Sequence, residues 1–389
     1  MMKTRRYILW VMAAALMAAC GNDADEAANG YVPSTEPIAF DASTDDEQTT
    51  RAPGETNDDA ALQAKGFGVF ASYTRNVKYE NTNVSPDFMY NQQVTYDAGA
   101  WKYAPTKYWP NNVNDDDSFR EYVTFFAYAP YEADPDAMKC IAAFSAEYDL
   151  GDPWLVYRIA QKPWGDYNTT TKTYENPQQA DLLYGVNADG GNKPWYDQQK
   201  PENTSKIKFT FLHALSCIGD VITIKMNDAL NTRLSGYATI TINKVEISYT
   251  NLTSKARLML SSDAAPNWKP IVSGDVTTTR TLTIEPATAV TLSTEAQEIS
   301  TGQGLFYIPL QVDVNPQRAD ITVYYTVNVT AGSSYNSTAT GTFNLSTDAD
   351  QIGKKQAIAL TIDKNLDLAH LVYDLTDDPA TGPSYIRKR

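Results

Sequence analysis

The run "VTFFAYAPY", residues 123–131, decides the fold class of this chain. Valine, threonine and aromatic residues favour β-strands, and here they follow one another with almost no polar interruption. Strict alternation of apolar and polar residues would indicate a strand that is buried on one face only. The denser run therefore predicts a strand in the core of a β-sandwich.

Similar runs surround this one in the first half of the chain. They include "GFGVFASYT" (66–74), "DLLYGVN" (181–187) and "KIKFTFLHALSCIGDVITIKM" (206–226). Turn-rich clusters such as "NADGGNKP" (187–194) separate them, as expected for short antiparallel strands. Within the last run, "HALSCIG" (213–219) is also compatible with a helical turn.

The second half of the chain continues the strand pattern. In "ATITINKVEISY" (238–249) the apolar alternation through Ile240 and Ile242 changes phase before Val245, Ile247 and Tyr249. A phase slip inside an alternating strand predicts a β-bulge. We therefore expect an all-β chain of two β-sandwich domains, residues 52–230 and 231–389.

Composition excludes one class of partner. The chain has 389 residues and a formal net charge of −15. Nucleic-acid-binding proteins carry basic faces, so no nucleic-acid partner is expected. Of the 3 cysteines, Cys140 and Cys217 could pair in an oxidising compartment, but two residues give no spacing pattern. Cys217 lies in an apolar run and is better interpreted as a small buried hydrophobe.

The N-terminus has the features of an export signal. Lys3, Arg5 and Arg6 precede an apolar segment of about a dozen residues, too short to span a bilayer of roughly 30 Å as a helix. The small residues before Cys20 resemble the lipobox of bacterial lipoproteins, with Met17 where that motif usually has leucine. The resemblance implies a signal peptide over residues 1–19 and a lipid, including palmitate, on Cys20. An ordinary secretory signal is the alternative.

Residues 20–51 are interpreted as a tether followed by a removable strand. Residues 21–35 are polar and acidic, and residues 36–44 alternate with Ile38 and Phe40 on one face. A polar segment with Pro53 and Gly54 follows, which predicts a long exposed loop. Arg51 is the only basic residue between Arg6 and Lys65 in the sequence. Exposed polar loops are the usual sites of proteolysis.

No catalytic or metal-binding constellation is evident. His213 and His370 are the only histidines, and no HExxH or CxxC spacing accompanies them. His213 stands in an apolar run, where a satisfied core residue is more common than a ligand or a general base. We expect no enzyme activity, no metal and no cofactor, and a hydrolase ranks last among the functions considered.

Four segments in order resemble one known family. They are "WKYAPTKYWPNN" (101–112), "VTFFAYAPY" (123–131), "ADLLYGVN" (180–187) and "KFTFLHALSCIG" (208–219). Together they resemble the fimbrillins, lipoprotein-derived subunits of type V pili. The resemblance implies two tandem transthyretin-like, Greek-key β-sandwiches and a structural role in an adhesive surface fimbria.

The resemblance also implies a route of assembly. A lipidated precursor would reach the outer membrane, and an arginine-specific protease would cut between Arg51 and Ala52. The first strand, with Ile38 and Phe40 as its plugs, would leave with the lipid. A strand from another pilus subunit would fill the groove by β-strand addition. The mature chain would then lie in the surface fimbrium as a stalk or tip subunit.

The C-terminal segment is the candidate donor strand. Its apolar residues Leu366, Leu368, Leu371 and Tyr373 follow the alternating stretch "AIALTIDKN" (357–365). The alternative is that these residues form only the last strands of the second sandwich.

The aromatic motif leaves a second function open. Trp101, Tyr108 and Trp109 could close one end of the sandwich, or they could form a platform for stacking sugars. The core interpretation is favoured because another aromatic run follows closely. The platform would suit a glycan-binding lipoprotein that stays lipid-anchored and monomeric. A host or bacterial surface receptor is a possible partner in either case.

Overall fold

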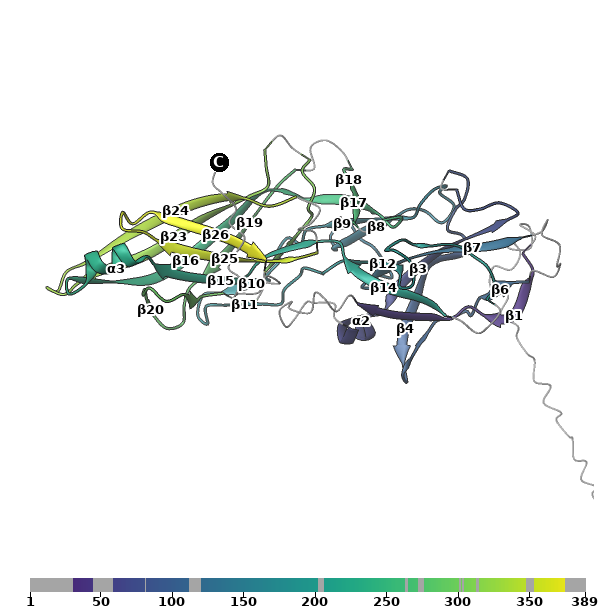
Figure 1. Cartoon of the computed structure of the whole chain (residues 1–389), viewed down its shortest axis with the longest axis horizontal. Helices are drawn as coiled ribbons and strands as arrows, with labels where there is room; N and C mark the ends of the chain where they lie inside the picture. The colour runs from purple at the N-terminus through teal and green to yellow at the C-terminus, as the bar shows by residue number, and fades with distance from the viewer. Residues whose placement is uncertain are drawn as a thin grey trace, which may run out of the picture.

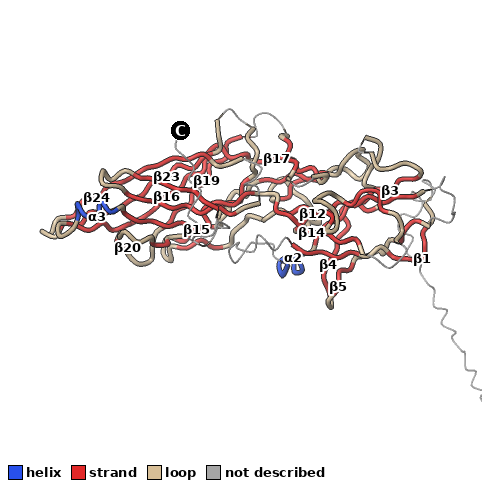
Figure 2. Tube along the Cα trace, in the orientation of Figure 1, coloured by secondary structure: helices blue, strands red, loops and turns tan. Residues whose placement is uncertain are grey.

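A computed structural model describes residues 31–44, 59–80, 82–111, 120–201, 206–262, 265–271, 276–300, 302, 304–312, 315–347 and 353–374. The described part is elongated and consists of two β-rich bodies placed end to end (Figures 1 and 2). Almost all of its regular structure is β-strand. The prediction of an all-β chain built from β-sandwiches is confirmed.

The N-terminal body is built around one large sheet. Its described strands follow the order β2-β14-β12-β7-β3-β4-β5, and β13 pairs with β7 beside this path. The bounds are β2 (Phe40–Thr44), β14 (Ile207–His213), β12 (Leu183–Asn187), β7 (Glu121–Ala129), β3 (Phe67–Arg75), β4 (Met89–Asp97), β5 (Ala100–Lys102) and β13 (Trp195–Gln198).

Strand β7 contains residues 123–129 of the run VTFFAYAPY, and all nine residues of the strand are buried. Successive side chains of a strand point to opposite faces of a sheet. Phe125 accordingly lies in one apolar cluster, with Phe67 and Phe209, and Phe126 lies in another, with Phe70 and Tyr157. The run is continuous because the sheet is covered on both faces, as predicted.

The large sheet curls so that its two ends meet. Strands β2 and β5 stand at opposite ends of the strand order, yet they are close in space. The cluster around Phe67 and Phe125 fills the inside of this curl. Smaller pieces complete the body: β1 (Pro33–Pro37) pairs with β6 (Tyr108–Pro110), and the helix α2 (Asp59–Lys65) buries Leu62 against the same cluster.

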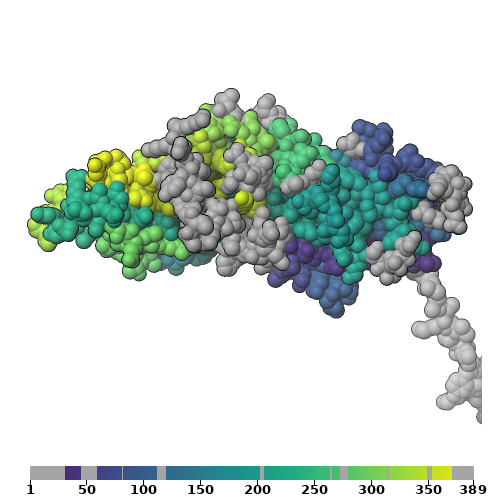
Figure 3. Space-filling view, in the orientation of Figure 1, coloured from purple at the N-terminus to yellow at the C-terminus, as the bar shows by residue number. Residues whose placement is uncertain are grey.

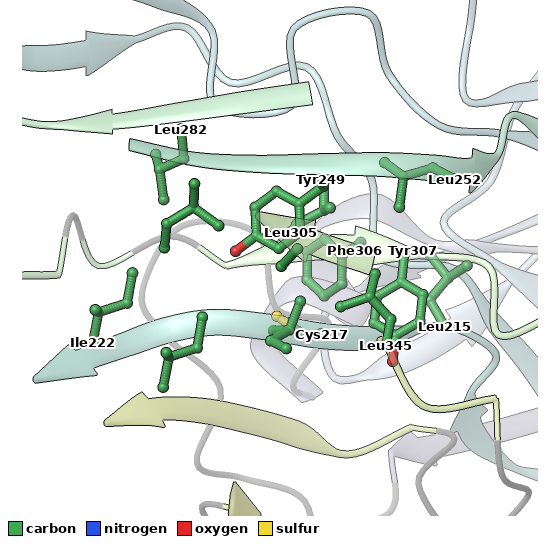
Figure 4. Close-up of a cluster of buried hydrophobic side chains, with 14 of the residues drawn as sticks. Leu215, Cys217, Ile222, Tyr249, Leu252, Leu282, Leu305, Phe306, Tyr307 and Leu345 are labelled. Carbon is green, nitrogen blue, oxygen red and sulfur yellow. The ribbon is translucent and has the colours of Figure 1, made fainter. Parts of the chain in front are cut away.

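Two facing sheets form the C-terminal body. The first has the order β21-β15-β25-β26, with β22 beside β15, and the second has the order β19-β16-β23-β24, with β20 beside β16. The bounds are β15 (Ser216–Met226), β21 (Gln297–Glu298), β22 (Leu305–Tyr307), β25 (Lys355–Ile362), β26 (Leu368–Asp374), β16 (Ala238–Thr253), β19 (Val276–Ile284), β20 (Val290–Thr291), β23 (Arg318–Val329) and β24 (Ser334–Asn344). Figure 4 shows side chains of both sheets meeting in the core between them.

The predicted bulge is present in β16. Ile242 pairs with Tyr325 and Lys244 pairs with the next residue back, Tyr324, so Asn243 between them is left out of the pairing register with β23. The extra residue restores the inward direction of Val245 and Ile247, which are fully buried. The helical turn considered for residues 213–219 is wrong, because β14 runs to His213 and β15 begins at Ser216.

Strand pairing crosses the predicted boundary at residue 230. A described four-stranded sheet has the order β18-β17-β9-β8, so β17 (Lys255–Met259) and β18 (Asn267–Lys269) join β9 (Trp154–Arg158) and β8 (Ile141–Phe144). Strand β15 also precedes residue 230 and belongs to the C-terminal body. The remaining elements are the hairpin of β10 (Asp166–Asn168) with β11 (Thr173–Glu175), and the helix α3 (Asp228–Leu234), capped by Asn227. The two-domain boundary and its transthyretin-like form stay predictions.

Candidate functional site

Strand β2 closes the curled sheet of the N-terminal body. It lies at the sheet edge and pairs with β14 in parallel, with Phe40 opposite Ile207, Ala42 opposite Phe209 and Thr44 opposite Phe211. Figure 3 shows atoms of residues 31–44, in purple, at the surface of this body. The segment is therefore an edge strand that reaches the surface of the body.

Phe40 is the main plug of this edge. Its side chain is 1% exposed, and its ring packs against four others, in Phe67, Tyr103, Phe125 and Phe209, at centroid distances of 6.3, 5.2, 5.9 and 6.2 Å. Removing such a ring would leave a cavity lined by aromatic faces. Ile38 is equally buried in the same cluster. Both predicted plugs thus lie in the core of the N-terminal body.

The backbone of Ile38 ties the two ends of the sheet together. Its N–H donates to the carbonyl oxygen of Lys107 at 2.9 Å, and the hydroxyl of Tyr103 donates to its carbonyl oxygen at 2.8 Å. Burial raises the pKa of the Tyr103 phenol well above its ordinary value, so the hydroxyl stays protonated and can donate. These bonds attach the residue between β1 and β2 to the loop before β6.

The other end of β2 is attached to α2. The N–H and the hydroxyl of Thr44 both donate to one carboxylate oxygen of Asp59, at 2.7 and 2.9 Å. Residues 45–58 connect these two partners along the chain, and Arg51 and Ala52 fall among them. The segment before Arg51 is thus bound at both ends to residues that follow it.

Residues ahead of Ile38 form a separate contact. The single strand predicted over residues 36–44 is wrong at its beginning, because β1 ends at Pro37 and β2 begins only at Phe40. Proline has no N–H to donate, which limits the β1 ladder. Tyr31 precedes β1, is buried against Tyr73 and Phe88, and donates to the carbonyl oxygen of Tyr108 at 2.6 Å.

At the far end of the molecule, β25 and β26 differ in how firmly they are held. Strand β25 lies between β15 and β26, and its Ala357, Ile358 and Ile362 are fully buried. Its first residue, Lys355, forms a buried ion pair of 2.7 Å with Asp220 of β15. Among the described strands, β26 pairs only with β25, so it is the edge of this sheet.

The candidate donor residues all fall in or beside β26. Leu366, with φ +68°, lies in the turn before this strand, and Leu368 is its first residue; both pack partly against the core. Leu371 and Tyr373 pair through their backbones with Ala359 and Ala357. In this structure the segment occupies its own sandwich, at an edge of the sheet.

The turn between β25 and β26 is fastened to α3. The carboxylate of Asp363 accepts from the N–H groups of Asn365 and Asp367, and Arg233 of α3 donates through Nη1 to the carbonyl oxygen of Lys364 at 2.6 Å. This turn is therefore both internally ordered and attached to the body.

The aromatic motif belongs mainly to the core. Trp109 is 2% exposed and packs edge-on against Phe125 at 5.9 Å. Trp101 packs against Phe67, and Tyr108 alone of the three is exposed. The core interpretation is confirmed for Trp109, whose buried ring is not available for stacking on a sugar in this structure.

The remaining sequence candidates are structural or lie elsewhere. His213 is buried with Nδ1 2.9 Å from Oδ2 of Asp181, so it lies in the core beside a carboxylate. Neither Cys140 nor Cys217 forms a disulfide in this structure, and Cys217 is buried in the apolar core as expected. Cys20, Arg51 and Ala52 lie outside the described residues.

The described residues offer neither a metal site nor a membrane-spanning helix. No group of three or more His, Cys, Asp or Glu side chains there is arranged to hold a metal ion. No helix in the described part has the length and apolar character needed to cross a membrane.

Comparison with known protein families adds the decisive observation. The model of one family, described as fimbrillin-like, matches residues 50–372. The chain belongs to the fimbrillin-like family. This is a family of fimbrial structural proteins rather than of enzymes, and the matched part of the fimbrillin-like chain begins immediately before Arg51.

Two relatives show how far the likeness of this fimbrillin-like chain extends. It is 27% identical over 268 residues to the fimbrium subunit Fim1C of Phocaeicola vulgatus, covering 68% of this chain and 62% of that protein. The chain thus spans less than two thirds of the length of that curated relative. A crystal structure of a fimbrial protein from Bacteroides vulgatus superposes with a TM-score of 0.61 at 22% identity, over 87% of this chain and 99% of the other. That likeness supports the fold.

Some residues of the fimbrillin-like site were not found from the sequence. Tyr103, Lys107 and Asp59 bind residues of the segment 38–44, but their partners stand 65, 69 and 15 residues away in the chain. No local periodicity predicts such contacts. The only available signal is that Tyr103 and Lys107 fall inside the family-like motif "WKYAPTKYWPNN".

Proposed function

We propose that this chain is a structural subunit of an adhesive surface fimbria, in the stalk or at the tip, and that it polymerises by protease-activated strand exchange. In this proposal Cys20 carries the lipid that holds the precursor at the outer membrane. An arginine-specific protease cuts between Arg51 and Ala52. The segment that contains Ile38 and Phe40 then leaves, and β26 of another subunit enters.

The single observation that carries the proposal is the position of β2. It is an edge strand whose departure would break no other strand pairing of the large sheet, yet it closes the curl and, together with Ile38 just before it, supplies the two buried plugs. Vacating it would uncover the aromatic cluster around Phe67 and Phe209 together with the free edge of β14. An uncovered apolar edge of this kind readily accepts another strand.

The C-terminal body supplies the complementary part. Strand β26 lies at a sheet edge, and the buried Lys355–Asp220 pair keeps β25 in place when β26 moves. Withdrawing β25 would also expose its buried Ala357, Ile358 and Ile362, so its departure is unfavourable. The turn at residues 363–367 is then the hinge, and Leu366, Leu368, Leu371 and Tyr373 lie beyond or within it.

The test uses the full precursor and an Arg51→Ala variant. Both are treated with an arginine-specific protease, and the new N-terminus is read by mass spectrometry. Wild-type chains should begin at Ala52 and form ladders that persist in SDS without boiling, whereas Arg51→Ala chains should stay monomeric. Deleting residues 364–389 should leave the cut intact and abolish the ladders. Chains that begin at Ala52 and remain monomeric would overturn the proposal.

A further inference from the structure

The segment that leaves and the segment that follows the hinge share a side-chain pattern. Residues 38–43 read "IAFDAS", and residues 371–376 read "LVYDLT". Position by position the two stretches carry an aliphatic residue, a small aliphatic residue, an aromatic residue, aspartate, an aliphatic residue and a hydroxyl residue. The two stretches lie at opposite ends of the chain.

This inference rests on the strand exchange proposed above. The shared pattern predicts the register in which the incoming strand pairs with β14. We infer that residues 371–376 of a second copy replace residues 38–43 at the same positions, parallel to β14. Tyr373 then takes the place of Phe40, Leu371 that of Ile38, and Asp374 that of Asp41.

The groove residues support this placement. Phe40 packs against the rings of Tyr103 and Phe209, and an aromatic ring is the group that fills this space without leaving a cavity. Leucine and isoleucine have the same number of carbon atoms, so Leu371 suits the buried site of Ile38. Ala42 is only partly buried, which leaves room for the larger Leu375.

The outward positions are consistent as well. Asp41 lies 3.8 Å from the Nζ atom of Lys206, and both side chains are about half exposed. Asp374 would meet the same ammonium group; an exposed pair of this kind contributes little affinity but disfavours a wrong register. Because side chains alternate between faces, a slip of one residue would turn Tyr373 out of the groove.

The correspondence between the two stretches stops after Thr376, and the other similar stretch of the chain, residues 358–363, matches residues 38–43 less well. The next position would put Asp377 where Thr44 donates to Asp59, so two carboxylates would meet and the correspondence stops at Thr376. Residues 358–363, "IALTID", also begin with Ile-Ala. They carry Leu360 and Thr361 where Phe40 and Asp41 stand, and they belong to β25, which is paired on both sides.

Paired cysteines between subunits test the register. Lys208 pairs with Asp41 in the structure, so the inference places it opposite Asp374 of the incoming copy. In one variant Lys208→Cys is combined with Asp374→Cys. In the control variant Lys208→Cys is combined with Thr376→Cys, which would be opposite Lys208 only if the register were slipped by two residues. Both variants carry Cys140→Ser, begin as the full precursor and are cut before oxidation. Reducible dimers that survive boiling in SDS are then measured.

The Lys208–Asp374 pair should cross-link on the order of tenfold more than the slipped pair, since a two-residue slip moves the partner by about 6.6 Å, beyond disulfide reach. Stronger cross-linking of the slipped pair, or none by either pair within SDS-resistant ladders, would overturn the register while leaving strand exchange intact. Absence of ladders in the cut wild-type chain would instead overturn the proposed function and the register with it.

Discussion

The hydroxyl of Tyr103 donates a 2.8 Å hydrogen bond to the carbonyl oxygen of Ile38, a residue 65 positions earlier in the chain. This bond joins the two ends of the large N-terminal sheet, because Ile38 leads directly into β2 and Tyr103 follows β5. The sheet is thus closed by a segment that lies before Arg51.

Tyr103→Phe should loosen this closure without creating a cavity. A hydrogen bond to a buried carbonyl contributes about 0.5–1.5 kcal/mol, and leaving the carbonyl unpaired costs about 1–3 kcal/mol. We expect the free energy of unfolding of the N-terminal body to fall by about 1–2 kcal/mol in urea titrations. Tyr335→Phe, at a side chain that is 61% exposed, is the control. Equal effects of the two variants would contradict the assigned role.

Phe40→Ala should destabilise the precursor far more than any other change in β2. Truncating a buried phenylalanine typically costs about 3–5 kcal/mol. Ser43→Ala, at an exposed position of the same strand, should change the unfolding free energy by less than about 0.5 kcal/mol. A Phe40→Ala effect below about 1 kcal/mol would mean that the segment is not an essential part of this core.

Lys355→Met should be strongly destabilising because it leaves Asp220 buried without its partner. The expected loss is about 3–5 kcal/mol, measured by denaturant unfolding. The double variant Lys355→Met, Asp220→Leu removes both charges and should recover most of the loss. If the double variant were as unstable as the single one, packing around β15 rather than the ion pair would be responsible.

Arg233→Ala should release the turn before β26 while barely changing global stability. The guanidinium donates to the carbonyl oxygen of Lys364 at an exposed site, so we expect a global loss below about 1 kcal/mol. Hydrogen exchange of amides in residues 363–374 should become faster, and ladders should form sooner after the cut. Arg318→Ala, at another exposed arginine, is the matched control. If hydrogen exchange in residues 363–374 did not change, Arg233 would have no role at the hinge.

Gly219→Ala should strain β15 where it bulges. The glycine has φ +80°, and an added Cβ would lie 2.7 Å from the hydroxyl of Tyr249, a side chain drawn in Figure 4. We expect a loss of about 1–3 kcal/mol in the unfolding free energy. Tyr249→Phe in the same chain should restore part of it by removing the clashing oxygen. If Tyr249→Phe restored none of the unfolding free energy, the whole loss would come from the backbone conformation at residue 219.

Local features of the fold were accessible from the sequence. The unbroken run of β7, the bulge at Asn243 and the burial of Trp109 each follow from side-chain type and alternation over a few residues. Ile38 and Phe40 were found as buried plugs for the same reason. Periodicity shows which face of a strand is apolar, and that information is enough to predict these local features.

Long-range pairing was not accessible in this way. Nothing near Phe40 indicates that its strand lies parallel to β14, which begins at Ile207. Likewise, the pairing of β9 with β17 depends on how the chain returns across the predicted boundary. The Thr44–Asp59 bonds depend on the position of a short helix that has no convincing periodic signal. Such contacts are determined by the packing of whole sheets.

The attachment of β2 to α2 has a consequence for timing. While residues 45–58 are continuous, β2 is tethered to its groove at an effective concentration in the millimolar range, so a strand from another molecule cannot compete. One hydrolysed peptide bond in this connection makes the same contact bimolecular and subject to dilution. Under the proposed function, the intact connection therefore keeps a subunit inert, and its hydrolysis commits that subunit to assembly.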